Sequence, residues 1–352
     1  MKVCVVGAGA IGGYLGVRLT LAGEDVTLIA RGGHLEAIKR KGLKLVNRDG
    51  TEEVARLFRA TSGFRNVEPQ DIVILAVKAH QIAPIVRNLR RLFSPHTMIV
   101  TMQNGIPWWY FQRHGGEHEA YRIKAVDPDG VIADTIEPER IIGCIAYPAA
   151  EISAPGVVRH IEGTRFPVGE LDGAETDRIK LVSDMFTRAG FKSPILPDIR
   201  AEIWLKAWGN LTFNPISALT HSTLVDICQY PLTRDLAATM MTEAQSIAHK
   251  LGITFRVPLE KRIAGAEKVG RHKTSMLQDV EAGKALEADA LLGAVVELGE
   301  VTHTPTPCMS AVYACVKLLA KTMTAEALYI KGRKAAPAAP VREAVVKLSA
   351  TG

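Results

Sequence analysis

The chain opens on Met1-Lys2-Val3-Cys4-Val5-Val6-Gly7-Ala8-Gly9-Ala10-Ile11-Gly12, and this stretch decides the fold. Its first half is short, apolar and β-branched, which is the pattern of a buried parallel strand. Its second half, Gly7, Ala8, Gly9, Ala10, Ile11 and Gly12, matches G-x-G-x-x-G. A helical pattern follows from Tyr14 to Ala22, and a second strand from Asp25 to Ala30. In this setting the glycines predict a tight turn whose backbone N–H groups bind the pyrophosphate of a dinucleotide. A glycine-rich turn that binds nothing is the alternative.

The residue at the end of the second strand distinguishes between two dinucleotides. An acidic side chain there would hydrogen-bond the free ribose 2′-hydroxyl of NAD. This chain has Arg31 instead. A guanidinium suits a 2′-phosphate, because it can donate two charge-assisted hydrogen bonds to it. The sequence therefore favours NADP over NAD, and the alternative is a solvated surface arginine.

Composition excludes several classes of protein. At 352 residues the chain is long enough for two domains, and 47% apolar with 23% charged residues is typical of a soluble globular protein. It has no apolar run of the roughly 20 residues that cross a bilayer and no signal-type start, so we expect a cytoplasmic protein with no membrane partner. The net charge of +6 suits an anionic ligand, but no dense basic stretch indicates a nucleic-acid partner. Five cysteines without a Cys-x-x-Cys pair indicate neither a disulfide framework nor a metal site.

Alternating strand and helix patterns continue as far as Pro197. The strands are expected at Asp71–Val77, Thr97–Met102, Ile141–Ala150, Gly156–Ile161, Phe166–Glu170 and Lys192–Leu196, with a helix at Thr176–Ala189. The first three strands after Arg140 are expected to be antiparallel. From Asp198 onward only helical patterns remain. The predicted fold class is α/β, with an N-terminal Rossmann-like dinucleotide-binding domain at 1–197 and an all-α C-terminal domain at 198–331. A tail at 332–352, rich in Ala, Pro and Lys, is expected to be loosely held.

Two polar residues follow predicted strands of the first domain. Lys78 comes directly after the strand at Asp71–Val77, and Asn104 comes after the strand at Thr97–Met102. Ligands of open α/β sheets bind at the carboxyl ends of the strands. Lys78 is therefore a candidate for a phosphate or ribose contact, and Asn104 for a contact with the nicotinamide or the substrate. A loop lysine and an ordinary Asn-Gly turn are the alternatives.

The segment from Glu202 to Pro215 reads as a helix. Apolar residues recur near a 3.6-residue period at Ile199, Ile203, Trp204, Ala207, Trp208 and Leu211. Lys206 and Asn210, one turn apart, lie at the edge of this apolar stripe. Partial desolvation there would lower the pKa of the lysine and make it a proton donor near neutral pH, unless its amine reaches water. Pro215 is expected to end the helix, directly after Asn214.

Three further segments have structural explanations of their own. Ser275 with Gln278 forms a capping-box pattern, and Glu287 begins an apolar helix, where the helix dipole favours an acid. By spacing alone neither would be called catalytic. The aromatic run Trp108-Trp109-Tyr110-Phe111 is either a packing wedge or a wall of the substrate site. His114 to His118 has the letters of a zinc motif, but two adjacent glycines argue against the helix that this motif needs.

Taken together, these segments resemble the ketopantoate reductase family, the NADPH-dependent 2-dehydropantoate 2-reductases. The resemblance covers nearly the whole chain, through the glycine motif with Arg31, Val77-Lys78-Ala79, Gln103-Asn104-Gly105, Lys206-x3-Asn210-x3-Asn214-Pro215, and Ser275-Met276-Leu277-Gln278-Asp279 with Glu287. The last two sets, in this order behind a dinucleotide fold, are specific to the family.

The resemblance implies a cleft between two domains that holds NADPH and a 2-oxo acid side by side. The cofactor would contact the glycine turn, Arg31, Lys78, Asn104, Glu287 and the region around Ala150. Lys206 would act as general acid and Glu287 would orient the substrate. Asn104, Asn210, Asn214 and Ser275 would bind the hydroxyl, keto and carboxylate groups of the substrate. Many relatives form homodimers, so a homodimer is the expected assembly.

Two departures from the family leave the substrate open. The family often has an asparagine about ten residues after Asn-Pro, where this chain has Thr223-Leu224-Val225, and another at the position of His272. The alternatives to ketopantoate reduction are a relative that reduces a different, bulkier 2-oxo acid and a sensor that binds NADPH without turnover. The presence of both Lys206 and Glu287 argues against the sensor.

Overall fold

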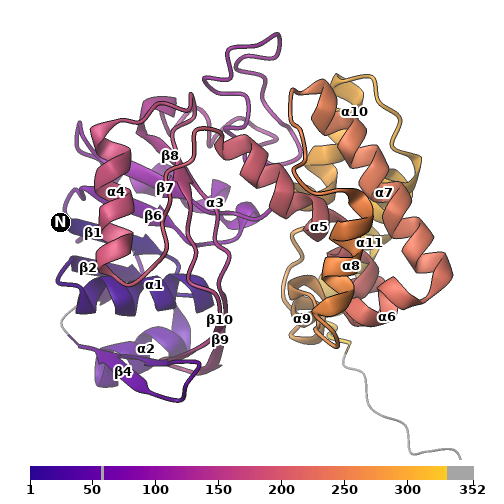
Figure 1. Cartoon of the computed structure of the whole chain (residues 1–352). Coiled ribbons are helices and arrows are strands. Elements are labelled where there is room, and N and C mark those ends of the chain that lie inside the picture. Colours follow the sequence, from indigo (N-terminus) through magenta and orange to yellow (C-terminus); the bar gives the residue numbers. More distant parts are fainter. Residues whose placement is uncertain (57–58, 331–352) are drawn as a thin grey trace, which may run out of the picture.

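The computed structural model describes residues 1–56 and 59–330. An α/β part formed by the first half of the chain stands beside a helical part formed by the second (Figure 1). The predicted α/β class, with a Rossmann-like domain followed by an all-α domain, is confirmed. The domain boundary at 197/198 stays a prediction, and the predicted tail at 332–352 lies outside the described residues.

The larger sheet has seven strands in the order β11-β8-β7-β6-β1-β2-β5. Their bounds are β1 (Lys2–Val6), β2 (Asp25–Ile29), β5 (Arg59–Thr61), β6 (Ile72–Leu75), β7 (Met98–Thr101), β8 (Ile141–Cys144) and β11 (Val168–Gly169). Every neighbouring pair is parallel except β11 with β8. All residues of β6, β7 and β8 are buried, as expected of parallel strands covered on both faces. The carboxyl ends of β1, β6 and β7 therefore bring Gly7, Lys78 and Asn104 to the same edge of the sheet.

A second sheet has four strands in the order β4-β3-β10-β9. Their bounds are β3 (Leu43–Val46), β4 (Glu52–Ala55), β9 (Ala149–Ala154) and β10 (Val157–Glu162). The antiparallel pairing expected after Arg140 holds for β9 with β10 and for β8 with β11, but the two pairs belong to different sheets.

Two strand predictions need correction. The strand predicted at Ile141–Ala150 divides into β8 and β9, because Pro148 lies between them and has no N–H to donate to a ladder. The strand predicted at Lys192–Leu196 is wrong. This segment forms only two isolated bridges, which join Arg165 with Lys192 and Val168 with Ile195. Pro194, which lies between the two bridged positions, again removes a donor from the ladder.

Four helices and three short 3₁₀ turns accompany the sheets. They are α1 (Ala10–Leu21), α2 (Gly32–Lys41), α3 (Ala83–Leu89), α4 (Asp177–Arg188), η1 (Ala79–Gln81), η2 (Arg90–Leu92) and η3 (Pro138–Arg140). The first of them, α1, packs closely on both sheets through its glycines. A Cβ on Gly13 would lie 2.7 Å from Val158 of β10, and one on Gly16 would lie 2.5 Å from Leu28 of β2.

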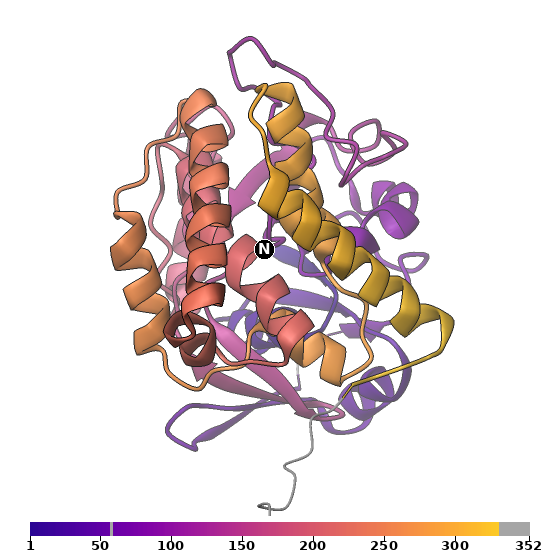
Figure 2. The same ribbon diagram turned by 90° about the vertical axis from the view of Figure 1, so that its right-hand side faces the viewer.

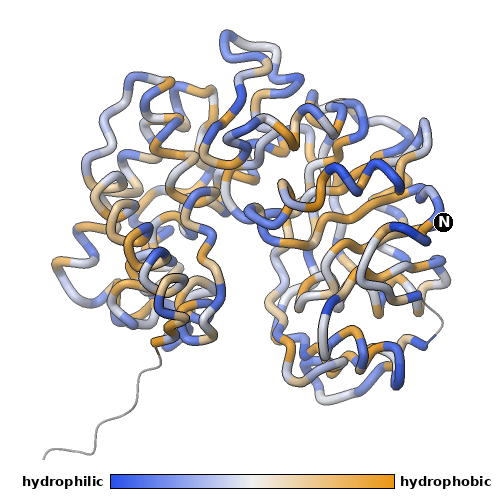
Figure 3. The backbone as a smooth tube through the Cα atoms, turned by 180° about the vertical axis from the view of Figure 1, so that it is seen from behind, coloured by the Kyte–Doolittle hydropathy of each residue, from blue (hydrophilic) through white to orange (hydrophobic). Residues whose placement is uncertain are grey.

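The remainder of the described chain is helical. Its elements are α5 (Ile199–Thr220), α6 (Leu224–Gln229), α7 (Pro231–Lys250), α8 (Leu259–Lys268), α9 (Ser275–Glu281), the π-helical segment η4 (Asp289–Gly293), α10 (Ala294–Val301) and α11 (Pro307–Ala325). Figure 2 shows these helices, coloured from rose through orange to yellow, lying in front of the α/β part. Apolar stretches gather inside both parts, while many outer turns are polar (Figure 3). Among the described residues, no helix is both long enough and apolar enough to span a membrane.

The prediction that Pro215 ends its helix is wrong, because α5 continues to Thr220 with Pro215 inside it. A proline in a helix interior costs about 3 kcal/mol. Burial of Phe213 and Ile216, each worth about 1.5–3 kcal/mol, offsets this cost. The helix therefore keeps Asn214 on the same rigid element as Lys206.

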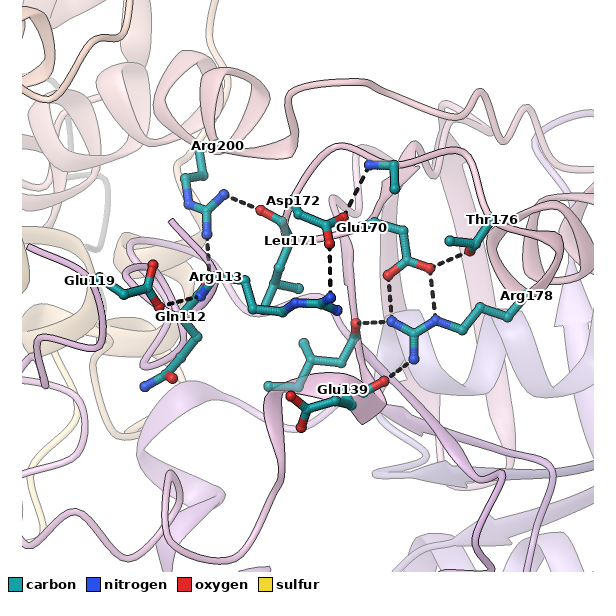
Figure 4. Close-up of polar contacts among 12 residues, drawn as sticks. Gln112, Arg113, Glu119, Glu139, Glu170, Leu171, Asp172, Thr176, Arg178 and Arg200 are labelled. Atoms are coloured by element: carbon teal, nitrogen blue, oxygen red, sulfur yellow. Dashed lines mark hydrogen bonds and ion pairs between the residues drawn. The ribbon is translucent and has the colours of Figure 1, made fainter. Parts of the chain in front are cut away.

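The segment 107–140, which separates β7 from β8, packs between the two parts of the molecule. Its aromatic run is buried, with Trp109 Nε1 donating to Thr101 Oγ1 at 2.9 Å and Trp204 Nε1 of α5 donating to the Tyr110 hydroxyl at 2.8 Å. Arg200, also on α5, donates to the carbonyl oxygens of Leu171 and Gln112 (Figure 4). The tandem tryptophans therefore act as a packing wedge.

The same segment also contacts α10. The carboxylate of Glu297 accepts hydrogen bonds from the Tyr121 hydroxyl and from the backbone N–H groups of Lys124 and Ala125, at 2.7–3.0 Å. One apolar cluster accordingly runs from the sheet through this segment into the helices. These contacts hold the sheet and α5 in a defined relation, on which the geometry of the site depends.

Candidate active site

The glycine turn between β1 and α1 leaves the N-terminus of α1 open. Gly7 has φ +101°, and a Cβ on Gly12 would come within 2.0 Å of the Gly7 carbonyl oxygen, so the turn excludes larger residues at both positions. A Cβ on Gly9, the N-cap of α1, would meet nothing within 4 Å. Backbone approach to a pyrophosphate is therefore unobstructed at this point.

Arg31 and Ala150 lie on elements that flank this turn. Arg31 follows β2 and is the exposed N-cap residue of α2. No carboxylate of the described residues forms an ion pair with Arg31, so its guanidinium is available to a ligand. Ala150 lies in β9, which packs against α1.

Lys78 reaches from the sheet edge to the helical part. Its Nζ donates to Asp279 Oδ2 at 2.5 Å and to the Ala285 carbonyl oxygen at 3.1 Å. Asp279 lies on α9, so the ion pair links the two domains. The sequence pattern alone does not indicate a role for Asp279. Its position four residues after Ser275, on the same face of α9, is the feature from which its nearness to the site could have been predicted. The cofactor contact of Lys78 stays a prediction.

Lys206 projects from the middle of α5 toward the end of β8. Its Nζ donates to the Ala146 carbonyl oxygen at 2.5 Å and lies 5.9 Å from the centre of the Tyr147 ring. Burial lowers the pKa of this ammonium to about 8, although the negative charge of Glu287 and the thiol of Cys144 act in the opposite direction. The shift has the direction expected of a desolvated lysine, and it brings the group into the range of general acids.

Glu287 lies two residues before the π-helical segment and near Asn104. The separation between Asn104 Nδ2 and Glu287 Oε2 is 3.5 Å. Burial raises the pKa of Glu287, while the positive charges of Lys78 and Lys206 hold it down. The carboxylate thus lies within electrostatic reach of both lysines, and its charge opposes the effect of burial on Lys206.

The π-helical segment contacts the loop after β7. Ile106 N–H donates to the Ala290 carbonyl oxygen at 2.9 Å. Gly105, with φ +85°, packs so closely that a Cβ would come within 2.0 Å of the same oxygen. This contact sets the distance between Asn104 and Glu287.

The proposed substrate-binding residues of the helical domain also approach one another. Asn214 Nδ2 donates to Ser275 Oγ at 3.3 Å. The predicted capping box of Ser275 is wrong, because the N-cap of α9 is Thr274, whose hydroxyl accepts from Leu277 N–H at 3.3 Å. Ser275 is therefore free for another role. Asn210 is half-buried on α5, one turn from both Lys206 and Asn214.

Sequence reasoning missed a second group beside Lys206. Glu202, one turn earlier on α5, accepts hydrogen bonds from the Tyr147 hydroxyl at 2.8 Å, from Arg165 at 2.5 Å and from Arg256 at 2.7 Å. Its side chain is only 2% exposed. The spacing of Glu202 and Lys206 was the only signal in the sequence. The hydrogen bond to Glu202 holds the ring of Tyr147 next to the Lys206 ammonium.

Comparison with known proteins identifies the family. The family model described as ketopantoate reductase PanE/ApbA matches residues 3–173, and the model of its C-terminal domain matches residues 198–320. A 2-dehydropantoate 2-reductase from Mesorhizobium japonicum is 50% identical over 321 residues, which are 91% of this chain and 98% of that protein. The chain belongs to the ketopantoate reductase family.

Solved structures agree with this assignment. A candidate ketopantoate reductase from Ralstonia solanacearum has a TM-score of 0.87 and 38% identity, and the match covers 91% of this chain and 98% of that one. A D-mandelate dehydrogenase in complex with NADH and anilino(oxo)acetate has a TM-score of 0.79 over 92% of this chain and all of that one. Its identity of 22% shows a shared fold alone. As a ketopantoate reductase family member, the chain is an oxidoreductase.

Proposed function

We propose that this protein is an NADPH-dependent 2-dehydropantoate 2-reductase, which reduces ketopantoate to (R)-pantoate for pantothenate and coenzyme A synthesis. The observation that carries the proposal is the half-buried Lys206, whose pKa of about 8 suits a proton donor, in a chain 50% identical to a 2-dehydropantoate 2-reductase. The open glycine turn and the exposed Arg31 suit the pyrophosphate and the 2′-phosphate of NADPH.

When bound, NADPH supplies a hydride to the keto carbon of the substrate. Negative charge then develops on the keto oxygen, where the Lys206 ammonium stabilises it and transfers a proton to form the hydroxyl. The neutral amine regains a proton from solvent, so the reaction consumes one NADPH and one proton for each pantoate. Glu287 stabilises the protonated form of Lys206, because its negative charge raises the pKa of the lysine and so opposes the effect of burial. Asn104, Asn210, Asn214 and Ser275 contribute hydrogen bonds to the hydroxyl, keto and carboxylate oxygens of the substrate.

Steady-state kinetics test the substrate. Ketopantoate and a panel of other 2-oxo acids would be compared at saturating NADPH. We expect kcat/KM for ketopantoate to exceed that of every other 2-oxo acid at least about tenfold, which corresponds to about 1.4 kcal/mol of transition-state binding. Equal turnover of ketopantoate and the panel would contradict the proposal. Preference for a larger acid would favour the alternative, a relative that reduces a bulkier substrate. Two departures from the family pattern, His272 and the absent asparagine near Leu224, are consistent with that alternative.

Replacement of Arg31 by Ala tests the cofactor assignment. Because a charge-assisted hydrogen bond contributes about 1.5–3 kcal/mol, we expect kcat/KM for NADPH to fall about 10- to 100-fold and that for NADH to change little. Arg40→Ala, which removes an exposed arginine from the other end of α2, serves as the control and should leave both values unchanged. An equal loss with NADPH and NADH would contradict a 2′-phosphate contact.

A homodimer in the cytoplasm is the remaining part of the proposal. Leu232 of α7 and Leu318 of α11, 70% and 64% exposed, offer apolar surface on the helical domain. Sedimentation of the full chain at micromolar concentration would give the mass of a dimer if the proposal holds and of a monomer if it does not.

A further inference from the structure

The Arg262 side chain of α8 reaches the backbone of α5 at Gly209, one helical turn after the proposed proton donor. A Cβ on Gly209 would come within 2.3 Å of one terminal nitrogen of the Arg262 guanidinium and 3.0 Å of its central carbon. The guanidinium therefore lies directly over the α5 backbone. Gly209 follows Lys206 by one helical turn and precedes Asn210, so Arg262 and these two residues share one region of the helix surface.

No acceptor for the charge of Arg262 occurs within residues 1–56 and 59–330. Its Nε is buried without a hydrogen-bond partner, and no carboxylate in this part of the chain pairs with the guanidinium. Burial lowers the pKa of Arg262, and only the phenol of Tyr147 acts in the opposite direction. Tyr147 does not neutralise it near pH 7, because burial and Glu202 raise the pKa of the phenol to about 12.

The carboxylate that accepts from Tyr147 is already engaged by other cations. Glu202 is paired with both Arg165 and Arg256. Tyr147, whose hydroxyl donates to Glu202, adjoins both Arg262 and Lys206. This region thus carries an excess of positive charge around one phenol ring. A buried N–H donor without an acceptor is costly, so the Nε–H of Arg262 is best explained by an acceptor that a ligand supplies.

We propose that Arg262 is a specificity-determining residue that binds an oxygen of the 2-oxo acid substrate. The inference rests on the proposed function. Two oxygens of ketopantoate could occupy this position, one of the carboxylate beside the keto carbon or the side-chain hydroxyl two carbons beyond it. A guanidinium donates paired hydrogen bonds to a carboxylate and a single one to a hydroxyl. In either case Arg262 selects for an oxygen that an apolar, uncharged analogue lacks.

The test compares Arg262→Met, which keeps an apolar stem and removes the charge, with wild type on three substrates. These are ketopantoate, its methyl ester, which has no carboxylate charge, and 3,3-dimethyl-2-oxobutanoate, which lacks only the hydroxyl. We expect Arg262→Met to lower kcat/KM for ketopantoate about 10- to 100-fold, mainly through KM, because a hydrogen bond to a charged group is lost. If Arg262 binds the carboxylate, the loss should become much smaller with the methyl ester, because the charge is gone. If it binds the hydroxyl, the loss should disappear with 3,3-dimethyl-2-oxobutanoate.

Loss of the preference for acid over ester identifies the carboxylate, and loss of the preference for the hydroxylated acid identifies the hydroxyl. An equal effect on all three substrates, or a tenfold weaker affinity for NADPH, would overturn the proposal. Lys261→Met removes a charge from the adjacent, exposed position of α8 and should change none of these ratios. Arg262→Lys keeps the charge but loses the planar guanidinium, so it should retain part of the substrate preference of wild type. It also tests the proposal if Arg262→Met does not fold.

Failure of the proposed function can be distinguished from failure of the role proposed for Arg262. If wild type prefers another 2-oxo acid, the ketopantoate assignment fails. The acid and ester forms of the preferred substrate then still test Arg262, because every 2-oxo acid carries the carboxylate.

Discussion

Lys206→Ala is expected to lower kcat for ketopantoate reduction by about 10²- to 10⁴-fold and to leave the affinity for NADPH unchanged. A positioned general acid contributes this range, and the variant removes the only proposed source of the proton. The ammonium lies next to the Ala146 carbonyl and the Tyr147 ring, so its removal does not disturb the glycine turn that is proposed to bind the cofactor. Fluorescence titration with NADPH and stopped-flow reduction measure the two properties separately.

Lys206→Met serves as the folding control. The pKa of Lys206 is about 8 in the folded protein, below its ordinary value, so the fold disfavours the protonated form and the ammonium reduces stability near pH 7. Methionine removes the charge and keeps the stem. Its melting temperature should equal or exceed that of wild type, while its activity should match that of Lys206→Ala. A sensor that binds NADPH without turnover would show no difference between wild type and either variant.

Gly105→Ala is expected to cause the second large effect. Its Cβ would lie 2.0 Å from the carbonyl oxygen and 2.4 Å from the carbonyl carbon of Ala290, and backbone atoms cannot rotate away. Relief requires the loop after β7 to separate from the π-helical segment, which breaks the Ile106–Ala290 hydrogen bond and moves Asn104 away from Glu287. We expect the free energy of unfolding to fall by about 3 kcal/mol or more and kcat/KM to fall at least about tenfold.

Gly115→Ala is the matched control for backbone strain. Gly115 also has a positive φ, +72°, but a Cβ there would meet nothing within 4 Å. It should therefore lose only the roughly 1–2 kcal/mol that a left-handed conformation costs a residue with a side chain. Urea unfolding and steady-state kinetics of the two variants would be compared. Equal stability and activity of Gly105→Ala and Gly115→Ala would contradict the role assigned to the contact with Ala290.

Local patterns in the sequence predicted the elements that carry the site. The glycine motif between two apolar runs gave the first strand, turn and helix, and the 3.6-residue periodicity around Lys206 gave α5 and the desolvated position of the amine. Such patterns suffice because they reflect interactions between residues close in sequence.

Other features depend on contacts between distant residues and could not be predicted. Helix α5 continues through Pro215 because its surroundings bury the residues after it. The ion pair of Lys78 with Asp279 and the hydrogen bond of Tyr147 to Glu202 join residues 201 and 55 positions apart. The N-cap of α9 is Thr274, one residue before the predicted Ser275, so the hydroxyl of Ser275 does not cap the helix. Each of these depends on tertiary packing, which overrides local propensity.

The pH dependence of single-turnover ketopantoate reduction by wild type and Lys206→Ala tests the central claim most directly. Only the protonated amine can donate, so the wild-type rate should be constant well below pH 8 and fall about tenfold per unit above the Lys206 pKa of about 8. The slow variant should show no such decline. A wild-type rate that does not fall above pH 8, or a decline that persists unchanged in Lys206→Ala, would contradict the assignment of Lys206 as the proton donor.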